Sequence, residues 1–197
     1  MLVPELFGQY GEKVKNLIFI CLDSFKEDYK NKQYDALAGK IYSEIDTLNQ
    51  EFSLLKLGII VGSLETIITK KPDIIVQMHE KSITAKLLTF MSKVDQDIGE
   101  KLLSVINETL PIPSEKSTDT MKEYLHYIAD VLLTSEIKSR HESEILLKMT
   151  KAQDKGLNEK ILNIVCKGLS KGCLREGLFS ILSIVFNSDE KFIMANI

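Results

Sequence analysis

Apolar residues recur along almost the whole chain at spacings of three and four positions. The clearest run is Ile98, Leu102, Val105, Ile106 and Leu110, which would all lie on one side of a helix. Similar stripes cover residues 14–25, 34–48, 83–94, 121–132, 145–149, 161–169 and 178–185. No run of alternating polar and apolar residues competes with this helical period. The pattern therefore predicts an all-α protein in which each stripe faces a core, the first stripe being Val14, Leu17, Ile18, Cys21, Leu22 and Phe25.

Helix-breaking residues fall between the stripes, where helix ends are needed. Lys70-Lys71-Pro72-Asp73 predicts the end of one helix and the start of another, and Pro111-Ile112-Pro113 predicts an extended connection. Ser117-Thr118-Asp119 offers an N-cap to the helix that follows. Gly156 and Gly172 lie where we expect helix C-termini, because glycine tolerates a positive φ.

The centres of neighbouring stripes are about 20 residues apart, so pairs of helices recur at about 40 residues. This period is typical of HEAT and armadillo arrays, in which stacked repeats share one core. A compact helical bundle would give the same stripes without requiring the period. We predict one repeat domain over residues 1–197, an α-solenoid of roughly 9–11 helices, with a possible sub-boundary at the loop 111–118.

One stretch of the chain resembles an armadillo repeat. A turn at Lys71-Pro72-Asp73 precedes a short first helix, Ile83 to Ser92 carries a second helix, and a polar turn at 94–97 leads into a third helix that ends near Asn107. The C-terminal part is similar, with 157–171 as a second helix and 174–186 as a third. The resemblance is to the superfamily and implies a curved array with a groove for a protein partner.

Peptide-binding armadillo proteins of the importin-α and β-catenin type carry Trp and Asn on the third helix. This chain has no Trp, and Leu103 and Phe179 stand near the Trp positions. Asn107 stands at one Asn position, and Ser183 replaces the other. The departure argues against binding of nuclear-signal peptides.

Composition narrows the class of protein. Apolar residues make up 44% and charged residues 27% of the 197 positions, which is typical of a folded protein and excludes general disorder. The longest apolar stretch, Leu54 to Ile68, is interrupted by Lys56 and Glu65, so no membrane insertion is expected. Three cysteines cannot form a complete disulfide framework, which fits a cytoplasmic or nuclear protein.

The charge is uneven along the chain. The net charge is -3, yet residues 138–175 carry nine basic and four acidic residues. This segment could face an acidic partner or nucleic acid, or form one solvated helical face, and no aromatic residue within it could stack on bases. The candidate partner-binding residues are Asn107, Lys148, Lys151, Lys155, Lys160, Lys167, Lys171 and Arg175.

No catalytic or metal-binding pattern stands out. His79, His126 and His141 have no second ligand at metal-binding spacing, and we expect each at the surface or partly buried. Cys166 and Cys173 are expected to be packing thiols, although a reactive Cys166 near Lys167 and Lys171 is the alternative. Gly58 and Gly62, four residues apart, predict close packing of a central helix. We therefore expect no cofactor, no metal and no enzymatic activity.

These features favour a non-catalytic protein-protein interaction scaffold or adaptor that presents a helical-repeat groove. The alternative is a chaperone cofactor of the Hsp70 exchange-factor or myosin-chaperone type, followed by a nucleic-acid-binding helical array. The apolar residues Phe192, Ile193, Met194 and Ile197 resemble the first helix of a further repeat, so we also expect the chain to be a piece of a longer protein.

Overall fold

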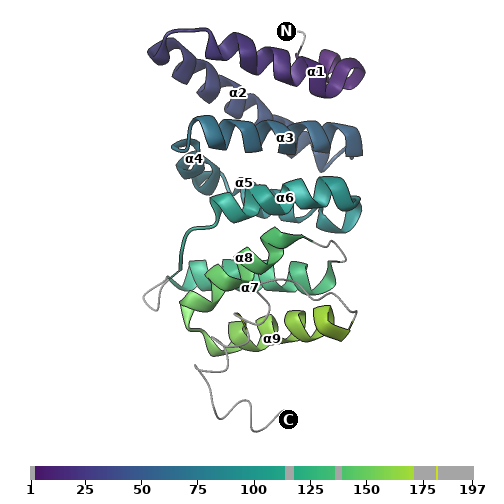
Figure 1. Ribbon diagram of the computed structural model, residues 1–197, viewed down its shortest axis with the longest axis vertical. Coiled ribbons are helices and arrows are strands. Elements are labelled where there is room, and N and C mark those ends of the chain that lie inside the picture. Colours follow the sequence, from purple (N-terminus) through teal and green to yellow (C-terminus); the bar gives the residue numbers. More distant parts are fainter. Residues whose placement is uncertain (1–2, 114–117, 136–138, 171–180, 182–197) are drawn as a thin grey trace. The chain divides into compact units, whose positions relative to one another are not determined.

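The computed structural model describes residues 3–113, 118–135, 139–170 and 181. Within these residues the secondary structure is entirely helical, which confirms the all-α prediction (Figure 1). The described helices are α1 (Val3–Asp23), α2 (Glu27–Leu48), α3 (Leu54–Lys70), α4 (Ile74–Glu80), α5 (Ile83–Leu88), α6 (Gln96–Thr109), α7 (Asp119–Thr134), α8 (Arg140–Met149) and α9 (Lys155–Ser170), with 3-10 turns at Met91–Lys93 and Thr150–Ala152.

The chain divides into two compact units. Unit 1 covers Met1–Thr109 and unit 2 covers Leu110–Ile197. The division falls immediately before the proline-containing segment Pro111–Pro113, where prolines prevent α6 from continuing.

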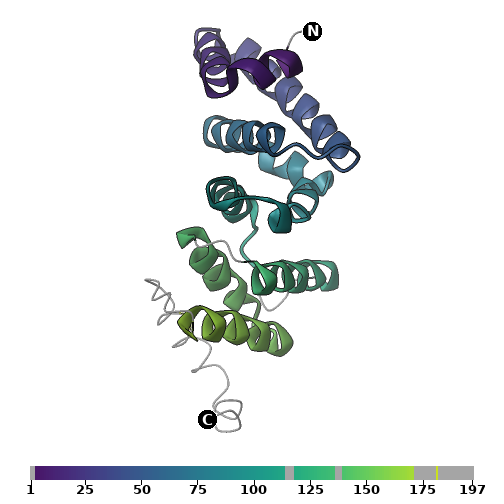
Figure 2. The same ribbon diagram turned by 90° about the vertical axis from the view of Figure 1, so that its right-hand side faces the viewer.

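Helix α3 is the centre of unit 1. It contacts α1 and α2 on one side and α6 on the other, while α4 and α5 pack against each other and against α6. In Figure 2 the helices α1, α3 and α6 form one layer of this unit, and α4 and α5 lie in a second layer. Leu57, Val61, Leu64 and Ile67 of α3 are completely buried, as expected for a helix with neighbours on several sides.

The junction between α3 and α4 has the ends that the sequence predicts. Ser53 caps α3 by accepting a hydrogen bond from the Lys56 backbone N–H (3.3 Å), and α3 ends at Lys70. The two lysines that follow the apolar part of α3 both form ion pairs, Lys70 with Asp23 and Lys71 with Asp35. These pairs connect the end of α3 to α1 and α2.

A buried tyrosine reinforces the contact between α1 and α2. The Tyr34 side chain is completely buried, stacks on Phe19 and donates its hydroxyl hydrogen to Asp23 (3.0 Å). Burial and the hydrogen bond to Asp23 raise the pKa of Tyr34 to about 12. The bond from Lys70, together with that from Tyr34, lowers the pKa of Asp23 and keeps it charged.

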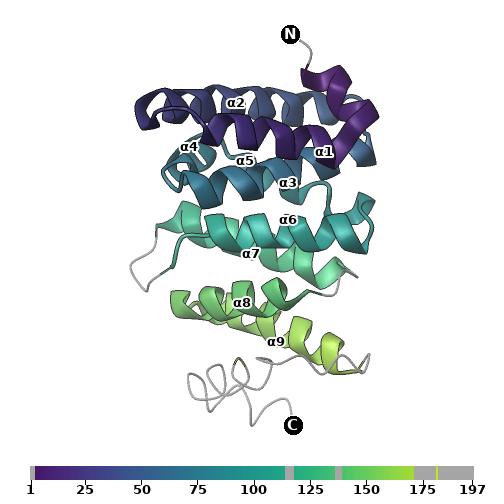
Figure 3. The ribbon, with the colours of Figure 1, turned by 45° about the horizontal axis from the view of Figure 1, so that its top comes forward.

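The predicted stripe of α1 is correct only in part. Leu22 is buried and Ile18 is partly buried as predicted, whereas Leu17, Cys21 and Phe25 are exposed. Phe19 and the side chain of Lys15, which the stripe did not include, are buried. The residues at 15, 19 and 22 lie on the arc that meets α2 and α3, and the other apolar arc of α1 is outside that contact. Helix α1 also bends at Gly11, whose φ of 44° lies in the left-handed region (Figure 3).

The single helix predicted over Ile83 to Ser92 is shorter than expected. Helix α5 ends at Leu88, and the chain turns through a 3-10 segment at Met91–Lys93. The Thr89 hydroxyl donates to the Lys86 carbonyl (2.7 Å), and the Phe90 N–H donates to Leu87 (3.0 Å), three residues back. These short-range bonds replace the α-helical ladder and direct Phe90 into the core.

Unit 2 is organised by the packing of α7 against α9. Thr118 caps α7 as predicted, accepting from the Met121 N–H (3.3 Å), and Ser139 caps α8. Asp154 precedes α9 and accepts the Leu157 N–H (2.8 Å). His126 of α7 lies 3.2 Å from the same carboxylate and therefore connects the two helices.

The placement of Gly156 at a helix C-terminus is wrong. Gly156 is the second residue of α9, and the left-handed conformation falls three residues earlier, on Gln153 with a φ of 50°. The chain uses Gln153 to leave the 3-10 turn and Asp154 to start the next helix. A glycine in this region therefore does not mark the end of a helix.

Asp154 gives unit 2 an acid-sensitive contact. The Leu157 N–H and then the neighbouring His126 hold the pKa of this carboxyl below its usual value. Its stabilising contribution is therefore present above the unfolded pKa of about 3.9 and is lost as the pH falls through the folded-state pKa. We expect Asp154→Ala to lower the free energy of unfolding by about 0.5–2 kcal/mol at neutral pH.

Urea denaturation at a series of pH values measures this effect. Asp154→Asn is the matched control, because its amide oxygen can still accept the Leu157 N–H but carries no charge. We expect the difference between the parent protein and Asp154→Asn to shrink in acid. A difference that stays constant down to the acid limit would contradict a role for the charge.

None of the described helices is both long and apolar enough to cross a bilayer. Several expectations lie outside the described residues: those for Lys171, Gly172, Cys173 and Arg175, for Phe179 and Ser183, for the predicted helix 174–186, and for the C-terminal segment 189–197.

Candidate functional site

A small pocket opens on the α1, α3 and α6 layer of unit 1. Its volume is about 170 Å³. Helices α3 and α6 contribute lining residues from their N-terminal halves. Helix α1 contributes Gly11 at its bend and Lys15 one turn later. The lining residues are Gly11, Lys15, Leu55, Gly58, Ile59, Ile98 and Lys101.

The glycines of α3 allow this pocket to form. A Cβ atom at Gly58 would lie 3.1 Å from Ile98 Cδ1, and a Cβ at Gly62 would lie 3.2 Å from the Nζ of Lys15. The neighbouring helices therefore approach α3 more closely than a larger residue would permit. This confirms the close packing that the Gly58–Gly62 spacing predicts.

The N-terminal cap of α6 positions one wall of the pocket. The Asp95 carboxylate accepts the Ile98 N–H (3.0 Å), and its backbone carbonyl accepts the Gly99 N–H (2.9 Å). Farther along the same face, Ser104 of α6 donates to Glu65 of α3 (2.9 Å). The Asp95 bonds thus order the start of α6 before Lys101, and the Ser104–Glu65 bond joins α6 to α3 after it.

The charged side chains that line the pocket are both lysines. Lys15 is buried and Lys101 is exposed, and the lining residues that the structure describes include no Asp or Glu. Lys101 forms no ion pair with any described residue, in contrast with Lys56, Lys70, Lys71 and Lys86, which pair with carboxylates of α1 or α2.

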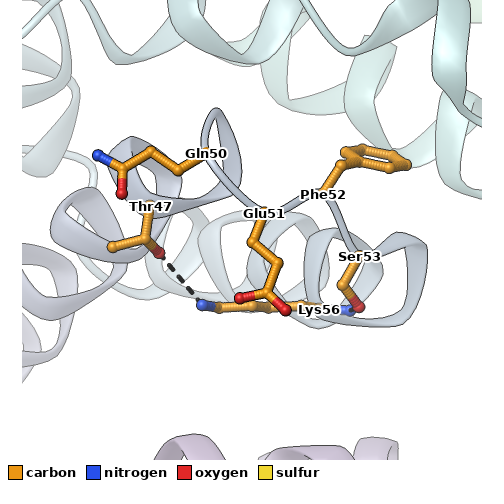
Figure 4. A pocket seen from close by; sticks show the side chains of 6 residues that line it. All are labelled: Thr47, Gln50, Glu51, Phe52, Ser53 and Lys56. Carbon is orange, nitrogen blue, oxygen red and sulfur yellow. Dashed lines mark hydrogen bonds between the residues drawn. The ribbon is translucent and has the colours of Figure 1, made fainter.

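A larger hollow lies at the turn between α2 and α3. Its volume is about 680 Å³, and its lining residues are Thr47, Gln50, Glu51, Phe52, Ser53 and Lys56 (Figure 4). The Lys56 ammonium donates to Thr47 (3.2 Å) and pairs with Glu44. The cation of this hollow is therefore already neutralised, which makes it a weaker candidate than the pocket at Gly58.

The residues that the armadillo resemblance places on the binding helix lie in the interior. Leu103 and Asn107 of α6 are both buried. Helix α6 contacts α3, α4 and α5, so a wide arc of its circumference is covered. Its exposed positions are instead Gln96, Asp97, Glu100, Lys101 and Glu108.

The predicted basic residues of unit 2 that the structure describes differ in their surroundings. Lys160 of α9 pairs with Asp130 of α7 (2.6 Å), and Lys167 donates to the Leu133 carbonyl (2.5 Å). These two lysines are seven residues apart on the α9 side that faces α7. Lys151 and Lys155 are exposed, and Lys148 is partly buried. The excess of basic residues in 138–175 therefore serves in part to join α7 to α9.

The histidines and cysteines form no metal site within the described residues, where no group of three His, Cys, Asp or Glu could hold an ion. His79 is exposed, and His126 and His141 are partly buried, as predicted. The prediction that Cys166 is a packing thiol is wrong, since its side chain is exposed on α9. The usual burial of cysteine therefore does not predict the exposure of Cys166 on α9.

The chain matches no protein-family model, no curated protein and no solved structure. Function is therefore inferred from this chain's own residues.

Sequence reasoning missed most of the pocket. Lys15, Leu55, Ile98 and Lys101 come from three helices, and nothing in their local sequence connects them. The one usable signal was the Gly58–Gly62 spacing, which indicates where neighbouring helices approach α3.

Proposed function

We propose that the protein is a non-catalytic interaction scaffold with an armadillo/HEAT-like arrangement of repeats. Its partner would dock on the α1, α3 and α6 layer of unit 1. The observation that carries this proposal is the pocket at Gly58, because it combines an apolar wall, close helix packing and the exposed ammonium of Lys101, which forms no ion pair with the residues that the structure describes. Concave sites with a few convergent polar groups are the usual places for ligands.

The order of helices in the second half of unit 1 supports the proposal. Two short helices, α4 and α5, precede the longer α6, which is the order of an armadillo repeat. In this interpretation α6 is a third helix, and α3 precedes it in the same layer (Figure 2). The pocket is then lined by residues of the third helix, although on a different arc from Asn107, the position that the resemblance assigns to partner binding.

Site-specific photo-cross-linking tests the proposed docking face. A benzoyl-phenylalanine replaces Leu55, which lines the pocket and is 58% exposed. The matched control carries the same group at Val76 of α4, which is 60% exposed and belongs to the other layer. We expect position 55 to capture defined proteins in cells that express the chain and position 76 not to capture them. Identical products from both positions, or none from position 55, would overturn the proposal.

A further inference from the structure

We propose that α1 pairs with α1 of a second copy of this chain, with the two helices antiparallel about a two-fold axis near Cys21. The observation behind this inference is an uncharged apolar stripe on the side of α1 that faces away from α2 and α3. The stripe is separate from the pocket at Gly58, so the inference does not depend on the proposed function.

After its bend at Gly11, α1 is apolar on two opposite sides. Phe19 and Leu22 are buried on the side that packs against α2 and α3, at one edge of unit 1 (Figure 3). Leu17 and Ile20 lie on the opposite side, where they are 60% and 67% exposed. A helix that is hydrophobic all round is normally covered all round, which indicates that the exposed side of α1 has a neighbour outside unit 1.

The turn after α1 lengthens this stripe. The Phe25 N–H donates to the Leu22 carbonyl, three residues back (3.2 Å), so the chain keeps a helical course beyond the end of α1. Phe25 follows the exposed Cys21 by four residues and therefore lies on the same side. Phe25 is 46% exposed and contacts Tyr29, which is 53% exposed, edge to face with ring centroids 5.0 Å apart. The apolar stripe thus extends past α1, with Cys21 near its middle.

Charge is confined to the two ends of the stripe. Lys15, the one charged residue between Lys13 and Asp23, is buried on the other side of the helix. The exposed positions between these ends that the structure describes are Asn16, Leu17, Ile20 and Cys21. A partner that placed a charged side chain there would lose hydration without gaining a counter-charge. A second copy of the stripe brings no such charge, so the surface is complementary to itself.

The ends of the stripe favour an antiparallel pair. In a parallel pair the Lys13 side chains of the two copies would face each other and the helix dipoles would be aligned, and both effects are unfavourable. In an antiparallel pair, Lys13 of each copy lies toward the start of α2 in the other, where Lys26, Glu27 and Asp28 are exposed. A two-fold axis through the middle of the stripe then makes every contact twice and brings the two Cys21 side chains close together.

The exposed area matches a small, reversible dimer. From their exposed fractions, the side chains of Leu17, Ile20, Phe25 and Tyr29 present roughly 450 Å², the size of the largest and often functional patch on a monomer. Two such faces bury roughly 900 Å², close to the total of about 1,000 Å² that a specific interface needs. Interfaces at this lower limit are weak, so we expect the dimer to dissociate in the micromolar range.

Sedimentation equilibrium of the full chain tests for the dimer between about 1 μM and about 1 mM, a range that brackets such an affinity. We expect the parent protein to shift from monomer to dimer across this range. Ile20→Asp should weaken the dimer at least about a hundredfold, because the two-fold axis buries the new carboxylate twice. Val76→Asp is the matched control and should change the affinity by no more than about twofold, because Val76 is similarly exposed but lies on α4. Helical circular dichroism checks that both variants fold.

Cross-linking of single thiols locates the axis. One variant carries Cys166→Ser and Cys173→Ser and keeps Cys21, and its matched control carries Cys21→Ser and Cys173→Ser and keeps Cys166, which is also exposed. A short bismaleimide should join two copies of the Cys21 variant at concentrations where the dimer forms. The Cys166 control should give much less of this product under the same conditions.

Each other outcome overturns the inference. A protein that is monomeric throughout the range, or that assembles beyond a dimer, would show that this side of α1 does not form a two-fold contact with a second copy. Equal dimerisation of Ile20→Asp and the parent, or equal cross-linking from Cys21 and Cys166, would place the contact elsewhere. Photo-cross-linking from position 55 tests the proposed function independently of these results.

Discussion

Leu102→Ala is expected to lower the free energy of unfolding by about 2–5 kcal/mol. Leu102 is completely buried in α6, where this helix contacts α3, α4 and α5. Its neighbours on the stripe, Val105 and Ile106, are also completely buried, so the side chain is enclosed by well-packed groups. The substitution removes apolar contact and leaves a cavity that three rigid helices can only partly close.

Chemical denaturation followed by helical circular dichroism measures this loss. Lys101→Ala is the adjacent control, because its side chain is exposed and its removal should change stability by no more than about 0.5 kcal/mol. The two neighbouring positions thus differ in their expected effect on the free energy of unfolding, with a large loss at Leu102 and almost none at Lys101. An unchanged denaturation midpoint for Leu102→Ala would mean that the stripe of α6 is assigned to the wrong face.

The stripe of α6 could be predicted from the sequence, whereas the stripe of α1 could not. In α6 the apolar positions outline one side of the helix, and that side is covered by its neighbours. In α1 apolar residues occur around most of the circumference, so periodicity alone cannot say which arc meets α2 and α3. The buried arc includes the long side chain of Lys15, which a hydrophobic pattern assigns to solvent.

The sequence predicted helix ends correctly where an N-capping residue or a proline marks the boundary. Thr118 before an acidic first turn, and Lys70 to Asp73 with its proline, both gave the correct boundary. The rule failed at Gly156, because the positive φ was taken by Gln153 and the helix start by Asp154. Glycine permits the left-handed conformation but does not require it.

The candidate site depends on tertiary packing and is therefore harder to predict. Gly11 and Lys101 are 90 positions apart in the sequence, and the pocket exists because α1 and α6 both lie against α3. The resemblance pointed to the third helix, α6, which also lines the pocket, yet it selected Asn107, which is buried. The rotation of α6 about its axis, which decides between Asn107 and Lys101, is set by its contacts with α4 and α5.

Phe90→Ala is expected to have the largest effect of any single substitution in the turn after α5. Phe90 is 0% exposed, and removing a buried phenylalanine side chain costs about 3–5 kcal/mol. Its ring stacks on Phe52 with centroids 5.7 Å apart, and the Lys93 ammonium lies 5.9 Å from its centre. The loss therefore combines a large cavity with the loss of two ring contacts, each of which orders a separate segment of unit 1.

Two further phenylalanines provide graded controls for this prediction. Phe25 is 46% exposed and contacts Tyr29 edge to face (5.0 Å), so Phe25→Ala should cost about 0.5–1.5 kcal/mol. Phe52 is 38% exposed and shares its stacking contact with Phe90. A double-mutant cycle on Phe52 and Phe90 should give a coupling energy of about 0.5–1.5 kcal/mol. Additive losses at these two positions, or a cost at Phe90 no greater than that at Phe25, would contradict the inward placement of the turn that follows α5.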